Sequence, residues 1–221
     1  MIKSTFNNLS AEKQQTIISA FLKEFTINKY DDASISKVLK SLGIAKGSFY
    51  QYFENKLSLY QYLIQTCGIK KMEYIQHVKR ENYEDFWAYW RALYQEGYKL
   101  DKDHPEMSNF MFAFYDSMNT PSLKEMFIQM REGGIAGLSA MIKVEVDNGA
   151  FRKDVSIEFM AHTLLTTSNG LFDAIRAKNS TEFERHMTEG LPIFADGFDT
   201  QYTELMENNI TILSQAFNAN T

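Results

Sequence analysis

The apolar residues of this chain recur at the spacing of an α-helix from one end of the sequence to the other. Near the N-terminus, Ile18, Phe21, Leu22 and Phe25 stand at positions i, i+3, i+4 and i+7, which places all four on one helix face. The same spacing predicts further helices over residues 83–100, 105–118, 121–148, 154–177, 181–197 and 202–217. Strand-like runs of Val, Thr and Ile are scarce, and the chain has only three prolines. The sequence therefore predicts an all-α fold.

Three helices joined by tight connections are expected at the N-terminus. Ser10 and Ser34 are suitable N-caps for the first two, because a serine hydroxyl can accept a hydrogen bond from a free backbone N–H. The first helix is expected to end near Asn28. Gly43 follows the second helix directly, and glycine readily adopts the left-handed conformation that ends a helix and turns the chain. A third helix over residues 45–52 completes the outline of a helix-turn-helix, whose second member can enter the major groove of DNA.

Charge is distributed unevenly along the chain. Residues 1–60 carry eight lysines and five acidic residues, a balance of +3, whereas the rest carries 15 basic and 23 acidic residues, a balance of −8. A basic segment joined to an acidic one suits a small DNA-contacting module on a body that does not touch DNA, since phosphate neutralisation requires local positive charge. Chance asymmetry of a solvated surface is the alternative.

The most specific pattern in the sequence is the run SISKVLKSLGIAKGSFYQYFENKLSLY, from Ser34 to Tyr60. It resembles the DNA-binding signature of the TetR family of bacterial transcription regulators, in which a threonine-led helix, a tight turn, GTLYxYF and a following SKxxL occur in this order. The resemblance covers residues 10–62. It implies a helix-turn-helix DNA-binding head over residues 1–55 and an effector-binding and dimerisation body over residues 56–221.

The third predicted helix has a buried face and a face left to DNA. Phe49 and Phe53 are four residues apart and should pack this helix onto the first one. Gln51 has the paired donor and acceptor suited to adenine, while Lys46 either reaches guanine or a phosphate or is an ordinary solvated lysine. With the positions that the resemblance implies, the candidate DNA-contacting residues are Ser34, Lys46, Gly47, Ser48, Tyr50, Gln51, Tyr52 and Lys56.

Two alternatives and two departures from the family accompany these candidates. Tyr50 and Tyr52 can instead be packing aromatics with exposed hydroxyls. At Ala45 serine or threonine is usual, so a helix cap and a phosphate contact are missing there. Leu39 and Leu42 replace residues that are commonly alanine and predict a bulkier core under the second helix.

The body is expected to consist of longer helices. Asn55 is the N-cap of a fourth helix that runs to about Lys79. Gly133, Gly134 and Gly137 lie in the middle of the long helix predicted over residues 121–148 and lower its stability there, because glycine has a low helix propensity. Either a neighbouring element packs closely at these glycines or the helix bends.

The resemblance also implies a homodimer. In the TetR family the last two long helices pack against their copies, and residues 154–177 and 181–197 match that pair by order and length. Pro192 is expected to kink the second of them. Two heads related by a two-fold axis would read a palindromic operator with half-sites about 34 to 36 Å apart or a multiple of that.

Aromatic side chains dominate the inward faces predicted for the body. Candidates for an apolar effector cavity are Phe86, Trp90, Tyr94, Phe110, Phe114, Tyr115 and Met118, joined by the polar residues His162, Thr166 and Asn169, whose stripe continues to Asp173. The alternatives are plain core for the aromatics and a solvated or interface edge for the polar stripe. The expected effector is a hydrophobic, flat organic molecule whose binding favours a head spacing unsuited to DNA.

Other functional classes lack support in the sequence. The four histidines show no metal-ligand spacing, and no nucleophile elbow or phosphate-binding glycine loop occurs, so we expect no enzyme, cofactor or metal. No stretch is apolar enough to span a membrane, no signal segment is recognisable, and the single Cys67 cannot form an internal disulfide. The prediction is a soluble, cytoplasmic repressor that an effector releases from DNA. A DNA-binding regulator whose body binds a protein partner, or no ligand, is the alternative.

Overall fold

The computed structural model describes residues 3–117, 120–195 and 198–219, and these residues form α-helices with short connections. The α-helices are α1 (Ser4–Asn7), α2 (Ala11–Asp32), α3 (Ile35–Ser41), α4 (Lys46–Tyr52), α5 (Lys56–Ile75), α6 (Phe86–Asp103), α7 (Pro105–Asp116), α8 (Lys124–Asp147), α9 (Ile157–Lys178), α10 (Ser180–Glu189) and α11 (Phe198–Phe217). Two 3₁₀ turns, η1 (Arg80–Asn82) and η2 (Pro121–Leu123), precede α6 and α8. The all-α prediction is confirmed.

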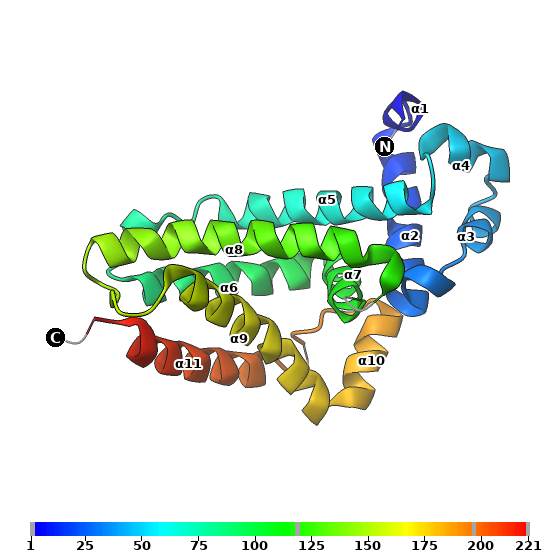
Figure 1. Cartoon of the computed structure of the whole chain (residues 1–221). Helices are drawn as coiled ribbons and strands as arrows, with labels where there is room; N and C mark the ends of the chain where they lie inside the picture. The colour runs from blue at the N-terminus through cyan, green and yellow to red at the C-terminus, as the bar shows by residue number, and fades with distance from the viewer. Residues whose placement is uncertain (1–2, 118–119, 196–197, 220–221) are drawn as a thin grey trace.

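Helices α1 to α4 form a head at one end of an elongated body (Figure 1). The predicted caps are present: the hydroxyls of Ser10 and Ser34 accept from the N–H of Lys13 and Lys37, each at 3.3 Å. Gly43 has a φ of +66°, as the predicted turn between α3 and α4 requires.

The first long helix differs from its prediction at its end. It continues past Asn28 to Asp32, but Lys29 has a φ of +54° and interrupts the helical backbone. The chain therefore changes direction one residue after the predicted end. The segment beyond the break places Tyr30 on Phe25, with the two rings stacked at 6.1 Å.

The core of the head continues into the body without a break. Phe21 and Phe25 of α2 belong to the same buried cluster as Tyr60 of α5 and Phe110 of α7. The rings of Tyr60 and Phe110 meet edge to face at 5.3 Å. The ring of Phe110 also lies 6.5 Å from that of Phe25 in α2, so a displacement of α7 would act directly on α2 of the head.

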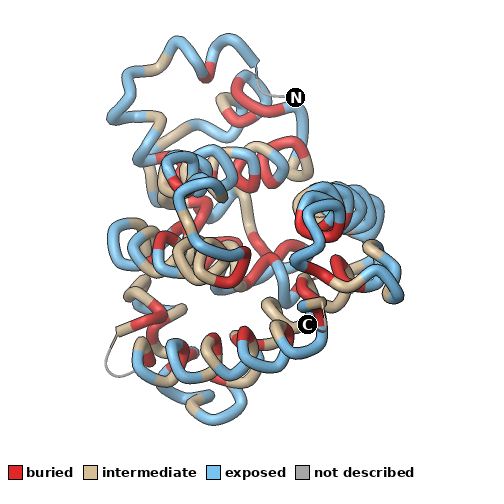
Figure 2. Tube along the Cα trace, turned by 90° about the vertical axis from the view of Figure 1, so that its left-hand side faces the viewer, coloured by how far each residue is buried: buried red, intermediate tan, exposed pale blue. Residues whose placement is uncertain are grey.

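Helices α5 to α11 make up the body, and buried residues lie along these helices in Figure 2. A second buried cluster joins residues of α6, α8, α9, α10 and α11. α9 packs against both α8 and α11. Away from the head, the indole N–H of Trp87 donates to Asn218 at 2.8 Å, and Glu145 of α8 accepts two bonds from the guanidinium of Arg80, at 2.7 and 3.0 Å. These polar contacts fasten the chain segments that flank the body helices.

Some helix boundaries in the body depart from prediction. α5 ends at Ile75, four residues before the predicted end. The helix expected over 181–197 is wrong in its second half: α10 ends at Glu189 because Gly190 takes the left-handed conformation, with a φ of +74°. Pro192 lies in the loop that follows and kinks no helix.

The loop after α10 is held by buried polar groups of α6 and α7. The carboxylate of Asp101 accepts from the N–H of Ile193 at 3.2 Å and of Phe194 at 2.9 Å. The amide of Asn109 donates to the carbonyl of Leu191 at 3.1 Å. These bonds fasten residues 191–194 to α6 and α7.

The glycines of α8 do not break that helix. A side-chain carbon added at Gly133 or Gly137 would meet nothing within 4 Å, and one at Gly134 would meet only Leu165, at 3.9 Å. Within this chain, close packing is therefore not the reason for these glycines. Among the residues that the structure describes, no helix is both long and apolar enough to cross a membrane.

Candidate nucleic-acid interface and body pocket

Helix α4 is seated on the head by two phenylalanines. Phe49 and Phe53 are both buried; the ring of Phe49 lies 6.4 Å from that of Phe21, and the ring of Phe53 lies 5.0 Å from that of Phe6. The predicted packing onto the first long helix is confirmed for Phe49, whereas Phe53 packs on Phe6 of α1 instead. The opposite face of α4 is consequently exposed, and it presents the side chains of Lys46, Tyr50 and Gln51, with Gly47 exposed and Ser48 half-buried beside them.

Tyr52 does not share that exposed face. It is only 9% exposed and its ring packs edge to face on Phe6, with 5.7 Å between the centroids. Since α1 covers it, Tyr52 takes the packing role and is removed from the groove-facing set. Tyr50 is 56% exposed and stays in that set.

A short helix that the sequence did not predict holds the other end of α4. The ammonium of Lys3 donates to the carbonyl of Tyr50 at 2.6 Å, and the backbone N–H of Lys3 donates to the carbonyl of Tyr52 at 2.9 Å. The hydroxyl of Thr5 donates to the carbonyl of Gln51. The last carbonyls of a helix have no partner within it, so α1 satisfies the C-terminal end of α4. With four residues, α1 is too short to show a periodic pattern.

The N-terminal end of α4 has no side-chain cap. Ala45 stands at the N-cap position, and only its carbonyl takes part, accepting from Ser48 at 2.9 Å. As the sequence predicts, the first turn of α4 lacks the hydrogen bond that a serine or threonine hydroxyl at position 45 would accept.

A hollow of about 230 Å³ lies where α3, α4 and α5 meet. It brings together three of the predicted DNA-contacting residues, Lys46, Tyr50 and Lys56; its other lining residues are Ile35, Ser36, Phe49 and Asn55. Asn55 is the N-cap of α5, as predicted, and forms a reciprocal capping box with Ser58, at 2.8 and 3.0 Å. Two ammonium groups beside a phenol hydroxyl make this hollow suitable for a phosphate.

Lys56 is held in place by groups at the end of α2. Its ammonium donates to the carbonyl of Asp31 at 3.1 Å and lies 5.0 Å from the ring centre of Tyr30. Burial lowers the pKa of Lys56, against the opposing effect of the nearby carboxylates of Asp31, Asp32 and Glu24. These contacts hold the ammonium group of Lys56 in one orientation among the residues that line the hollow.

Ser34 anchors the start of α3. Its hydroxyl caps α3, and its N–H donates to the carboxylate of Glu24 at 2.8 Å. That carboxylate also lies 3.6 Å from the ammonium of Lys37, most of which is exposed. Lys37 is a basic residue beside the predicted flank that the sequence analysis did not single out.

Three predicted effector residues belong to the packed core instead. Phe86, Phe110 and Phe114 are at most 2% exposed and are in contact with neighbouring rings. Neither of the two described hollows includes them. Phe110 and Phe114 pack on Tyr60 of α5, and Phe110 also lies 6.5 Å from the ring of Phe25 in α2, so this face of α7 joins the body to the head. The predicted role of these three in lining a cavity is therefore replaced by core packing.

The remaining predicted effector-binding residues lie in different surroundings. Trp90 and Tyr94 are half-buried, and the hydroxyl of Tyr94 donates to Ser168 at 2.6 Å. His162 and Thr166 do not line the body pocket described next. Met118 lies outside the described residues.

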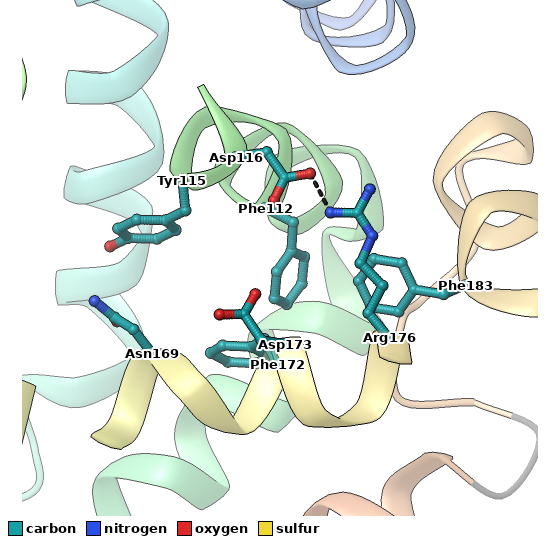
Figure 3. Close-up of a pocket in the computed structure, with 8 residues that line it drawn as sticks. All are labelled: Phe112, Tyr115, Asp116, Asn169, Phe172, Asp173, Arg176 and Phe183. Atoms are coloured by element: carbon teal, nitrogen blue, oxygen red, sulfur yellow. Dashed lines mark hydrogen bonds and ion pairs between the residues drawn. The ribbon is translucent and has the colours of Figure 1, made fainter. Parts of the chain in front are cut away.

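A pocket of about 60 Å³ lies between α7, α9 and α10 (Figure 3). It includes Tyr115 and Asn169 from the predicted set and Asp173 from the predicted polar stripe. The lining residues are Phe112, Tyr115, Asp116, Asn169, Phe172, Asp173, Arg176 and Phe183. Phe112 is on the face of α7 that the sequence analysis did not select.

The charged groups of this pocket are partly paired. The guanidinium of Arg176 donates to Asp116, as Figure 3 shows, and it also donates to Glu184 at 2.6 Å. It also lies 5.7 Å from the ring centre of Phe183. The pKa of Arg176 is raised, although burial acts to lower it, because these two carboxylates favour its charged form. Asp173 points its carboxylate toward the middle of the pocket, as Figure 3 shows.

Reactive and metal-binding groups are few in the described part of the chain. Burial raises the pKa of the Cys67 thiol to about 12, so little of it is the reactive thiolate at neutral pH. No group of three His, Cys, Asp or Glu side chains is placed to hold a metal ion among the residues described.

Comparisons with known proteins agree with this geometry. A family model described as bacterial regulatory proteins, tetR family, matches residues 17–63, which span most of α2, all of α3 and α4, and the start of α5. The chain is 22% identical over 153 residues to the HTH-type transcriptional regulator YvdT of Bacillus subtilis (strain 168), covering 69% of this chain and 77% of that protein.

Solved structures extend the likeness to the whole chain. A TetR family transcriptional regulator from Chloroflexus aurantiacus J-10-FL superposes with a TM-score of 0.76 at 26% identity, and each chain is covered completely. A transcriptional regulator from Rhodococcus sp. Rha1 has the same fold, with a TM-score of 0.64 at 20% identity over 94% of this chain and 98% of that one.

Proposed function

We propose that this chain, which is a TetR-family transcriptional regulator, represses transcription by binding a palindromic operator as a homodimer and leaves the DNA when a small molecule occupies its body. In this proposal residues 1–55 form the DNA-binding head and residues 56–221 the regulatory body. The observation that carries the DNA-binding part is the seating of α4. Phe49 and Phe53 bury one face, and the other presents Lys46, Tyr50 and Gln51 to a major groove.

Each exposed group has a proposed role. Gln51 reads a base edge, because its amide can donate to and accept from adenine at once. Lys56 and Tyr50 hold a backbone phosphate in the hollow between α3, α4 and α5, while Lys46, on its rim, contacts a phosphate or guanine. Ser34, Gly47 and Ser48 complete the backbone contacts from the flank of α3 and the first turn of α4.

A homodimer is supported by exposed apolar groups on two long helices. Phe159 of α9 and Ile212 of α11 are each 65% exposed. These helices pack on one another, and we assign α9 and α11 to the self-pairing surface in place of the predicted 181–197 segment. Two-fold pairing would place two copies of α4 on successive half-sites of the operator.

Release by a small molecule is supported by two helices that line the pocket and also pack against the head. α7 and α10 both line the pocket, through Phe112 and Phe183, and both pack against α2. On the head side of α7, Glu106 accepts from the hydroxyl of Ser19 at 2.6 Å. A ligand that displaces α7 would therefore move α2, provided that it binds one arrangement more tightly than the other.

A second candidate keeps the DNA-binding head and replaces the small molecule by a protein partner or by no ligand. The modest volume of the pocket, about 60 Å³, favours this version. Thermal-shift screening of the full chain against small molecules discriminates between them, since a ligand that raises the melting temperature supports the first.

The test of DNA binding is selection from a random duplex library, followed by anisotropy titration of the selected duplex. Lys56→Ala should weaken binding to all sequences similarly and reduce the slope of the logarithm of the binding constant against the logarithm of the salt concentration by about one. Gln51→Ala should cost about 1 to 3 kcal/mol and relax preference at particular bases. Gln61→Ala, an exposed glutamine of α5 away from α4, is the matched control. Equal losses for Gln51→Ala and Lys56→Ala on selected and random DNA would contradict these roles.

A further inference from the structure

The pocket between α7, α9 and α10 is built mainly from aromatic rings. Phe112 lies edge to face on Phe172, with 4.6 Å between the ring centres, and 5.9 Å from Phe183. Tyr115 is 38% exposed at the same pocket. Aromatic faces carry partial negative charge, so rings arranged around a hollow attract a cation as well as an apolar group.

The ionised groups of the pocket add further negative charge. Arg176 is one cation that already pairs with two acids, Asp116 and Glu184. Asp173 forms no hydrogen bond or ion pair with any residue in the described part of the chain, and its carboxylate points into the pocket (Figure 3). Among the lining residues two acids, Asp116 and Asp173, stand against one base, Arg176, which leaves an excess of one negative charge, and Glu184 pairs with the same base from outside the lining. An anion placed here would meet Asp173 without a cation free to offset it.

The protein itself shows how this pocket accommodates a cation. The guanidinium of Arg176 lies over the ring of Phe183 while it pairs with carboxylates on either side. A ligand cation between Asp173 and the rings of Phe112 and Phe172 would be held by the same two kinds of contact. Its charge would replace the partner that Asp173 lacks.

We propose that this pocket binds an organic cation, a protonated amine or a quaternary ammonium, with Asp173 as its counter-ion and Phe112 and Phe172 as its aromatic walls. The proposal revises the neutral hydrophobic effector expected from the sequence. It rests on the proposed function only in taking this cation to be the effector. The binding of the cation to the pocket does not depend on DNA.

The volume of the pocket limits what enters it. About 60 Å³ is well below the roughly 150 Å³ of a dry cavity that holds benzene. The charged head group therefore lies against the carboxylate of Asp173, which is exposed to solvent, and any larger substituent extends out of the pocket. Benzylammonium has this shape, and benzyl alcohol and benzoate keep its ring while changing the charge to zero and to −1.

The experiment measures the affinity of the full-length protein for these three probes by saturation-transfer NMR and calorimetry, without DNA. Benzylammonium is expected to bind at least about fivefold more tightly than benzyl alcohol, and benzoate most weakly. Asp173→Asn should remove that preference for the cation, and Asp173→Glu should retain part of it. Glu158→Gln is the matched control, because it removes the same charge from an exposed position of α9 outside the pocket.

The outcomes separate this proposal from the proposed function. Equal affinity for benzylammonium and benzyl alcohol, or an unchanged affinity in Asp173→Asn with a native circular dichroism spectrum, would overturn the cation site. Selective cation binding that depends on Asp173 would support it even if the protein failed to bind any duplex, a result that would refute the proposed function alone. With the operator present, benzylammonium should lower the DNA affinity of the wild type and leave that of Asp173→Asn unchanged.

Discussion

Replacing Phe110 by alanine tests whether head and body unfold as one unit. Phe110 is completely buried, and its ring lies 5.3 Å from that of Tyr60 and 6.5 Å from that of Phe25. Removing a fully buried phenylalanine costs about 3 to 5 kcal/mol, and the loss of two edge-to-face contacts favours the upper half of that range. With a urea m-value of about 2 kcal/mol/M, the unfolding midpoint should fall by about 2 M.

The assay uses two probes that report on different parts of the chain. Both tryptophans, Trp87 and Trp90, lie in α6 of the body, so their fluorescence follows the body; amide hydrogen exchange in α2 to α4 follows the head. The buried cluster of Phe110 joins α2 of the head to α5 and α7, and both of these helices pack on α6, which carries the tryptophans, so Phe110→Ala should shift both signals by the same amount. Phe151→Ala, equally buried but distant from the head, is the control, and all variants are compared at one protein concentration. The reasoning is refuted if the head loses protection in Phe110→Ala while the tryptophan transition stays where it was.

Two further predictions concern stability. Burial raises the pKa of Asp101 to about 6, so the folded chain keeps a proton that the unfolded chain releases above pH about 4. The free energy of unfolding should therefore fall by about 3 kcal/mol as pH rises from 4 to 6 and then level off, and urea titrations across this window should show a flatter profile for Asp101→Asn. Gly43→Ala should cost about 1 to 2 kcal/mol at its positive φ, whereas Gly68→Ala within α5, where an added carbon meets nothing within 4 Å, should stabilise by about 0.5 to 1 kcal/mol. Thermal melts with the same sign for both glycine variants would contradict the second prediction.

The head was predictable because its signals are local. Ser10, Ser34 and Asn55 each cap a helix through a residue three positions further on, and Gly43 needs only its own backbone conformation. The buried face of α4 follows from a four-residue spacing. What the sequence could not supply was α1, whose bonds to α4 join groups more than 40 residues apart.

The body pocket was harder to predict because α7 is apolar on two faces. Periodicity selects Phe110 and Phe114, which pack toward the head, and passes over Phe112, which faces the pocket. Asp173 appears in the predicted polar stripe, but the presence of Phe183 in the same pocket depends on how α10 folds back after α9. Spacing along one helix carries no information on that packing.

The contacts between α1 and α4 would also affect the thermodynamics of the proposed binding to DNA. A helix of seven residues is too short to persist in water by itself, and α4 is that length. Because Lys3 and Thr5 donate to its final carbonyls, α4 would reach a duplex already ordered in the proposed complex, and the entropy lost in fixing its backbone would belong to folding rather than to association. Deleting residues 1–5 would transfer that entropy loss to the binding step, which calorimetry would record as a less favourable binding entropy for the same base contacts.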